Sequence, residues 1–188
     1  MIARTETQGQ LDEDGERAEE PPLPLTVDVV HEHGDWTVCE PICEAVSAVA
    51  AEIAQRIDLG RAACSACLAL SSDADVARLN GLYRGMPKPT NVLSFPAPAE
   101  RSAAAEGGFL GDIVLARETV LAEAAAAGIP PRHHLMHLVA HGLLHLIGYD
   151  HETSEDAAEM EALEVEILAA LGVADPYAAG EPEIEGTS

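Results

Sequence analysis

The chain has 188 residues, of which 47% are hydrophobic, so it is long and apolar enough for one domain with a buried core. Its net charge of −23 argues against a general nucleic-acid binder, because contacts to phosphate groups require a basic surface. The chain contains no apolar run of about 18 residues and no secretory signal pattern, so we expect a cytoplasmic protein without a membrane partner.

The acidic residues lie mainly toward the two ends of the chain. Residues 1–24 carry a net charge of −5 and residues 151–188 a net charge of −11, which leaves −7 for residues 25–150. We predict that residues 1–24 form a disordered acidic extension, because they hold little apolar surface to bury, and that residues 174–188 form a second disordered tail. The folded domain would then span residues 25–173.

The first half of the domain is predicted to alternate strands with helices, over residues 25–31, 41–57, 63–70 and 74–82 in turn. The first strand is rich in β-branched residues, and the helices repeat apolar residues at helical spacing. Ser72 and Asp73 offer N-cap side chains to the second helix. A loop with one glycine and two prolines then covers residues 84–90.

The second half is predicted to bring two strands and then three helices. The strands cover residues 91–95 and 110–115 and flank a mobile loop over residues 97–108. The helices cover residues 116–127, the segment from Pro130 toward Gly148, and residues 154–171, which begin with the capping pattern Ser154-Glu155-Asp156. This order predicts an α+β fold, in which a small mixed sheet of about four strands is covered by about five helices.

Three histidines follow the spacing H-x3-H-x5-H, namely His141, His145 and His151. Residues four apart lie one above the other on a helix, so the imidazoles of His141 and His145 should converge. Gly148 allows the chain to turn back and bring His151 to the same point. Three imidazoles around one open position are typical of a catalytic zinc site. We therefore predict one Zn²⁺ per chain, although another divalent transition metal could bind.

The same segment lacks the base of a zinc peptidase. Peptidases with similar spacing place a glutamate directly after the first histidine, and this chain has Gly142 there. Peptide hydrolysis by that route is therefore disfavoured. Metal-assisted hydrolysis remains open, because zinc lowers the pKa of bound water to about 7.

The segment from His141 to His151, H-G-L-L-H-L-I-G-Y-D-H, resembles the signature of the YbeY family of metal-dependent endoribonucleases. The resemblance extends over L-N-G-L-Y-R-G (79–85), P-T-N-V-L-S-F-P (89–96), L-G-D-I-V (110–114) and E-M-E-A-L-E (159–164). It implies a compact sheet with a zincin-like metal helix beside it. It also implies cleavage of single-stranded RNA in maturation of the small-subunit ribosomal RNA 3′ end and in ribosome quality control. The implied substrate is a ribosomal RNA precursor, with the ribosome or its associated proteins as further partners.

Arg84 is the predicted catalytic residue. Phosphodiester cleavage needs a group that stabilises the charge developing on the phosphate, and a guanidinium can bind two phosphate oxygens. The alternative is an ordinary surface arginine at a helix end. The resemblance favours the catalytic role, because an arginine at this motif position is associated with RNA cleavage. Met86 and Pro87 stand where many relatives carry lysine and aspartate, although Lys88 could replace part of that charge.

Five further polar residues are expected around the metal or along the substrate groove: Asp112, Asp150, His137, Ser94 and Asn91. Either aspartate could orient a ligand histidine by accepting its second N–H, or could accept a proton. A fourth protein ligand would close the site, so His137 is expected beside the ligands or in the core. Ser94 and Asn91 lie on the extended segment that could border the groove.

The four cysteines form two close pairs, Cys39/Cys43 and Cys64/Cys67, whose spacing could suit a zinc site. Cys64 and Cys67 lie on a predicted strand, where residues three apart point to opposite faces. Buried thiols are therefore the better interpretation. His31 and His33 are expected to be exposed residues at a strand end.

Two other functions remain open on the sequence. One is a metallopeptidase whose base comes from elsewhere, such as Asp112. The other is a non-catalytic protein that binds ribosomes, in which the metal has only a structural role and links the helix to the following turn. The sequence does not determine the metal used in the cell, the cleavage position, the attacking nucleophile or the oligomeric state.

Overall fold

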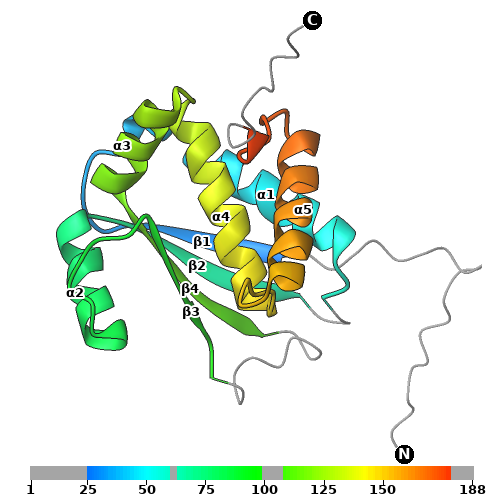
Figure 1. Ribbon diagram of the computed structural model, residues 1–188, viewed down its shortest axis with the longest axis horizontal. Coiled ribbons are helices and arrows are strands. Elements are labelled where there is room, and N and C mark those ends of the chain that lie inside the picture. The colour runs from blue at the N-terminus through cyan, green and yellow to red at the C-terminus, as the bar shows by residue number, and fades with distance from the viewer. Residues whose placement is uncertain (1–24, 60–62, 99–107, 179–188) are drawn as a thin grey trace, which may run out of the picture.

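The computed structural model describes residues 25–59, 63–98 and 108–178. Within these ranges the chain forms one four-stranded sheet, five α-helices and a short 3-10 helix (Figure 1). The α+β fold predicted from the sequence is therefore confirmed. The predicted extension over residues 1–24 and most of the predicted loop over residues 97–108 lie outside the described residues.

The sheet is mixed, with the strand order β1-β2-β4-β3. The parallel strands are β1 (Leu25–His31), β2 (Cys64–Ser71) and β4 (Phe109–Ala116), and β3 (Val92–Pro96) pairs with β4 in the antiparallel direction. The two inner strands, β2 and β4, are the most buried, which agrees with their apolar runs. The antiparallel β3 forms one edge of the sheet, next to α4.

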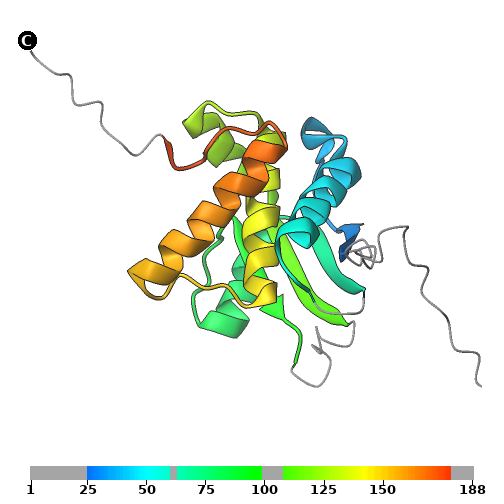
Figure 2. The same ribbon diagram turned by 90° about the vertical axis from the view of Figure 1, so that its right-hand side faces the viewer.

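Two helices, α1 (Ile42–Arg56) and α4 (Pro131–Ile147), pack on one face of the sheet, and α5 (Ser154–Ala170) packs against both (Figure 2). Apolar side chains of all three helices and of β1, β2 and β4 form the main core. The 3-10 helix (Thr37–Cys39) precedes α1. None of the helices in the described ranges has the length and apolar character needed to cross a lipid bilayer.

The opposite face of the sheet is covered by α2 (Asp73–Arg84). Val76 and Leu79 of this helix pack against Leu93 of β3 and Val114 of β4 in a second, smaller core. The α3 helix (Arg117–Ala127) follows β4 and leads into α4. Because α2 ends beside β3, its last residue, Arg84, reaches the same edge of the sheet as α4.

The α4 helix begins and ends where the sequence signals predict. Pro131 lies in its first turn, where a missing backbone N–H costs nothing. Gly148 ends it with a φ of 112°, and its N–H bonds to the carbonyls of Leu144 and His145 at 3.1 Å each. The chain then reverses over Tyr149 and Asp150, which brings His151 back toward the end of the helix.

The predicted start of α5 at Ser154 is confirmed. Its N-cap is Thr153, because the Thr153 hydroxyl accepts a hydrogen bond from the backbone N–H of Asp156 at 3.1 Å. One predicted boundary was wrong. The tail predicted from residue 174 begins inside the folded part. Tyr177 donates a hydrogen bond to the buried Glu164, so this contact holds the segment against α5. Residues 179–188 lie outside the described part of the chain.

Candidate metal centre

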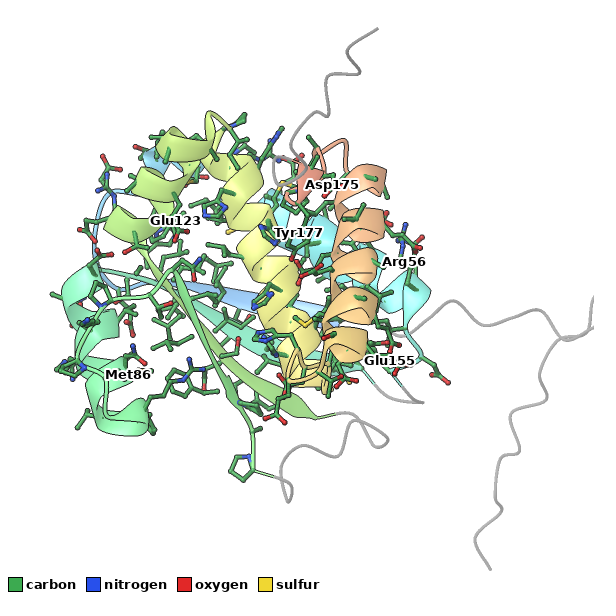
Figure 3. The ribbon with its side chains drawn as sticks, viewed as in Figure 1. Arg56, Met86, Glu123, Glu155, Asp175 and Tyr177 are labelled. Carbon is green, nitrogen blue, oxygen red and sulfur yellow. The ribbon has the colours of Figure 1, made fainter. Side chains whose placement is uncertain are left out.

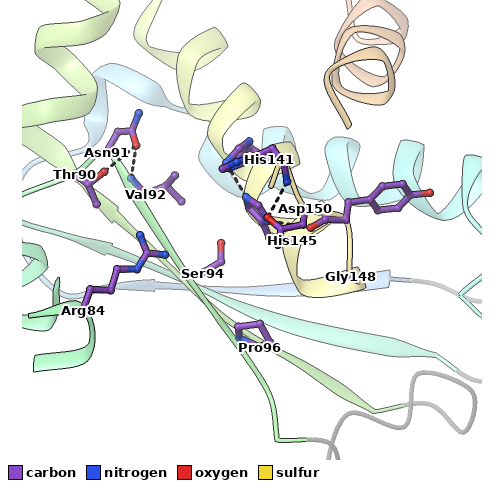
Figure 4. Close-up of a pocket in the computed structure, with 12 residues that line it drawn as sticks. Arg84, Thr90, Asn91, Val92, Ser94, Pro96, His141, His145, Gly148 and Asp150 are labelled. Carbon is purple, nitrogen blue, oxygen red and sulfur yellow. Dashed lines mark hydrogen bonds between the residues drawn. The ribbon is translucent and has the colours of Figure 1, made fainter. Parts of the chain in front are cut away.

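Three histidines converge at the C-terminal end of α4. Figure 4 shows two of them, His141 and His145, side by side on the last turns of the helix. One nitrogen from each of His141, His145 and His151 lies within 4.8 Å of the other two, so the predicted convergence is confirmed. The Nε2 atoms of His141 and His145 are 3.1 Å apart. Two ligands held about 2.0–2.1 Å from a tetrahedral zinc ion are separated by roughly 3.3 Å. These two imidazoles are therefore already placed to share one ion.

Hydrogen bonds fix the tautomers of the two helical histidines. The Nδ1–H of His141 donates to Oε1 of Glu164 at 2.8 Å, and the Nδ1–H of His145 donates to the backbone carbonyl of Tyr149 at 3.0 Å. Both Nε2 atoms are left with a lone pair directed at the shared point. Burial, and then the neighbouring His141, lower the pKa of His145, which favours the neutral ring that a metal requires.

The carboxylate of Glu164 lies behind these histidines and is fully buried. Its Oε2 accepts hydrogen bonds from Nε2 of His137 at 2.8 Å and from the Tyr177 hydroxyl at 2.5 Å. Tyr177 lies beside α4 and α5 (Figure 3). Burial alone would raise the pKa of this carboxyl, but hydrogen bonds from His137, His141 and Tyr177 outweigh it and lower the pKa to about 2. Glu164 is thus an anion that anchors His141.

The role of Glu164 was missed at the level of sequence, although a signal was present. Glu164 shares the buried face of α5 with Met160, Ile167 and Leu168. An acid at an inward position of an amphipathic helix must find hydrogen-bond donors, because an unpaired buried charge is costly. Here α4 contributes two donors, His137 and His141, and the segment after α5 contributes the third, the Tyr177 hydroxyl.

A pocket of about 520 Å³ opens beside the histidines. Its lining comes from the end of α2, from β3 and the segment before it, and from the end of α4 with the following turn: Arg84, Thr90, Asn91, Val92, Ser94, Pro96, His141, His145, Gly148, Tyr149, Asp150 and His151. Arg84 extends from the end of α2 toward the β3 segment of this lining (Figure 4). Within the described part of the chain, its guanidinium has no hydrogen bond or ion pair to another residue. It is therefore available to a ligand.

Ser94 and Asn91 lie in the pocket wall, whereas Asp150 lies in the turn before the third histidine. The Ser94 hydroxyl is 3.5 Å from the carbonyl oxygen of Gly142. The Asn91 amide donates to Glu123 at 3.0 Å, and its oxygen accepts from the backbone N–H of Val92 at 2.8 Å, which fixes its orientation. Asp150 lines the pocket but accepts its hydrogen bond from the backbone N–H of the next residue, not from an imidazole.

Asp112 does not lie at the metal centre, contrary to prediction. The β4 strand has one extra residue relative to β2 beside Gly111, and such a bulge reverses the alternation of side chains that follows. Leu110 and Ile113 therefore both face the main core. Asp112 points to the opposite face of the sheet, opposite Cys67 on β2. It can neither orient a ligand histidine nor take a proton in the pocket.

Gly142 faces the sheet rather than the pocket. A Cβ atom at this position would lie 2.9 Å from Cδ1 and 3.0 Å from Cγ2 of Ile113, which is fully buried. The glycine therefore lets α4 approach β4 closely. A glutamate at this position would have to displace Ile113, so this packing excludes the peptidase base.

The cysteines do not gather into a metal site within the described part of the chain. Cys39 and Cys64 are buried, as expected, whereas Cys43 is exposed. Burial, and then the charge of Asp112, raise the pKa of the Cys67 thiol, which keeps it protonated. His33 is exposed, as predicted, and its Nδ1 lies 2.9 Å from a carboxylate oxygen of Asp75.

The fold and the histidine cluster together define an α+β protein whose three-histidine group could hold a metal ion next to an open pocket. The family model described as Endoribonuclease YbeY matches residues 32–172, so the chain belongs to the YbeY family. A protein named Endoribonuclease YbeY from Rhodospirillum rubrum is 56% identical over 124 residues, which cover 64% of this chain and 62% of that protein.

Two further proteins of the same name match more of the chain. Those from Parvibaculum lavamentivorans and Bradyrhizobium diazoefficiens are 46% and 49% identical, and each match covers 84% of this chain. The matches cover 88% and 87% of those proteins. The solution structure of TM1509 from Thermotoga maritima matches 86% of this chain and 99% of its own, with a TM-score of 0.48 and 23% identity.

Proposed function

We propose that this chain is a zinc-dependent endoribonuclease that hydrolyses phosphodiester bonds in single-stranded RNA. One observation carries the proposal: Arg84 and the three histidines line the same pocket, although they are far apart in the sequence. A histidine cluster suited to a cation, beside a guanidinium that has no partner among the described residues, suits a phosphate ester. Membership of the YbeY family supports the proposal, since the relatives at 46–56% identity are named endoribonucleases.

The proposed roles follow the chemistry of each group. His141, His145 and His151 would hold the ion through neutral imidazoles, and Glu164 would keep His141 in the required tautomer. Bound zinc supplies Lewis acidity, which lowers the pKa of water and neutralises phosphate charge. Arg84 would bind the non-bridging phosphate oxygens and stabilise the charge that develops during cleavage.

The proposed substrate is a precursor of small-subunit ribosomal RNA, cut in maturation of its 3′ end, with a further role in ribosome quality control in the cytoplasm. The net charge of −23 disfavours tight binding to naked RNA. We therefore expect the ribosome or a ribosome-associated protein to present the RNA to the enzyme.

The rival functions have less support. A metallopeptidase would need a base near the metal, and Gly142 faces Ile113 while Asp112 lies on the other face of the sheet. A purely structural metal would close its coordination sphere with protein ligands, whereas this cluster opens on a pocket.

The decisive experiment is cleavage of a precursor ribosomal RNA fragment, scored on a denaturing gel. It compares intact protein, chelated protein, chelated protein with zinc restored, and His145→Ala. We expect cleavage to vanish with the metal, to return with zinc and to be absent in the variant. Circular dichroism of the chelated protein provides the control, because a structural metal would leave the chain unfolded. A casein digest tests the peptidase alternative.

A further inference from the structure

The charge of this chain is unevenly distributed around the pocket. Residues 76–98 contain no acidic residue and hold three of the ten basic residues, Arg78, Arg84 and Lys88. The whole chain carries 33 acidic residues. The end of α2 and the segment that follows it therefore form the part of the surface most compatible with a polyanion.

The same segment exposes apolar side chains next to Arg84. Leu82 is 72% exposed, Tyr83 is 70% exposed and Met86 is 54% exposed. Three of the six large hydrophobic residues that are exposed in the described part of the chain thus fall within five residues. Met86 lies beside the end of α2 (Figure 3). Clustered exposed apolar residues mark a binding surface more often than singly scattered ones do.

The ring of Tyr83 packs against a second aromatic ring. The ring contacts that of Phe95, with a centroid distance of 5.0 Å and an interplanar angle of 58°. Phe95 is anchored in the smaller core on β3, directly after Ser94, which lines the pocket. One side of the Tyr83 ring therefore rests on the strand that borders the pocket, and most of its remaining surface faces solvent.

From this arrangement we infer that Tyr83 is the stacking site for an unpaired base of single-stranded RNA, adjacent to the phosphate bound by Arg84. The inference rests on the proposed function and adds a base-binding subsite to it. Aromatic rings accept any base, so the subsite would tolerate many sequences. A base in a duplex is already paired and stacked, so the subsite would favour single strands. Arg78 forms an ion pair with Asp75 at 3.3 Å, but Arg84 and Lys88 near Tyr83 favour RNA over a protein partner.

The test uses the full-length protein with and without zinc. Binding of a fluorescein-labelled oligoribonucleotide without secondary structure is measured by anisotropy in chelator, so that the RNA is not cut. Tyr83→Ala and Tyr83→Leu should weaken RNA binding and raise the Kd by about 5- to 150-fold, the range expected for the loss of one base–aromatic stack. Tyr83→Phe should retain binding. Val38→Ala, which removes an exposed apolar side chain elsewhere, is the matched control.

A second arm places a single abasic nucleotide at each position of the RNA in turn. For the wild-type protein, an abasic nucleotide at one position next to the cleavage site should raise the KM for the RNA. An abasic nucleotide at the same position should not change the KM of Tyr83→Ala, because the stacking contact is already missing. Equal Kd and KM for wild type and Tyr83→Ala would overturn the inference while leaving RNA cleavage intact. So would a Tyr83→Ala variant that binds RNA normally but no longer sediments with ribosomal subunits, because the surface would then bind protein. Absence of cleavage by the wild-type enzyme with zinc would instead count against the proposed function.

Discussion

Glu164 holds His141 in place across the interface between α4 and α5, with a distance of 2.8 Å between its Oε1 and the Nδ1 of the imidazole. The second oxygen of this carboxylate accepts hydrogen bonds from His137 and Tyr177. One buried anion therefore connects His141 to His137, one turn earlier on α4, and to Tyr177 in the segment after α5. Carboxylates that orient metal-binding histidines also raise the basicity of the ring.

Replacing Glu164 with glutamine should weaken zinc binding. The glutamine side chain keeps the size of glutamate but loses its charge and presents an N–H₂ group where an acceptor is needed. We expect the zinc affinity of Glu164→Gln to fall by about 10- to 100-fold, as for other carboxylates behind metal ligands. Competition with a chromophoric chelator measures it. Glu166→Gln, an exposed position on the same helix, is the control for the charge change. Unchanged affinity in a folded Glu164→Gln protein would show that Glu164 serves only the fold.

Local rules predicted the histidine cluster. Helical spacing places His141 above His145, and a glycine with positive φ ends the helix before His151. All three positions follow from residues within one short segment. The strands and helices were likewise predicted within a few residues, because their apolar periodicity and terminal glycines are also local.

Contacts between distant segments were not predictable in the same way. The role of Glu164 depends on how α5 packs against α4, which the sequence of either helix does not determine. Asp112 was misplaced because one extra residue beside Gly111 reverses the side-chain alternation of β4. Arg84 was singled out through the family resemblance, since its sequence neighbourhood alone is that of a surface arginine at a helix end.

Removing the guanidinium of Arg84 should impair cleavage without loss of the metal. We expect Arg84→Ala to lower kcat by about 100- to 1,000-fold, the usual effect of deleting one group that stabilises transition-state charge. The kcat of Arg84→Lys should lie between those of wild type and Arg84→Ala, because an ammonium group cannot make the bidentate contact of a guanidinium. Single-turnover cleavage and zinc content are the two measurements, with Arg56→Ala on α1 as the control. Full activity of Arg84→Ala would remove this residue from the mechanism.

The close contact between Gly142 and Ile113 predicts energetic coupling between the two positions. Gly142→Ala adds a methyl group 2.9 Å from Cδ1 of Ile113, and overpacking of this kind costs about 1–3 kcal/mol, offset by up to about 1 kcal/mol of helix propensity. Ile113→Val removes that Cδ1 atom. In the Ile113→Val background, Gly142→Ala should therefore be less destabilising by about 0.5–1.5 kcal/mol. Urea denaturation of the four proteins measures the coupling. If the free-energy changes of the two substitutions simply add, the two positions are not coupled, and α4 must move away from β4 to accommodate the added methyl group.

The N-termini of α2 and α3 cap each other, and this predicts a pH-dependent part of the stability. The Glu118 carboxylate accepts a hydrogen bond from the backbone N–H of Asp73 at 2.8 Å, while the Asp73 carboxylate accepts from the backbone N–H and the hydroxyl of Thr119 at 2.9 Å each. The hydrogen bond from Asp73 is the main cause that lowers the pKa of Glu118 below its ordinary value of 4.5. The folded protein thus favours the ionised form.

Because the pKa of Glu118 is lower in the folded state, its contribution is complete above the unfolded pKa and is lost as the pH falls through the folded pKa. Glu118→Gln should therefore cost about 0.5–1 kcal/mol at pH 7, as for a weakened helix cap, and the difference from wild type should shrink as the pH falls below 4.5 and through the lowered folded pKa. Urea midpoints across this range measure the effect, with Glu166→Gln as the exposed control. A difference that stays constant with pH would assign the stabilisation to packing rather than to the ionised carboxylate.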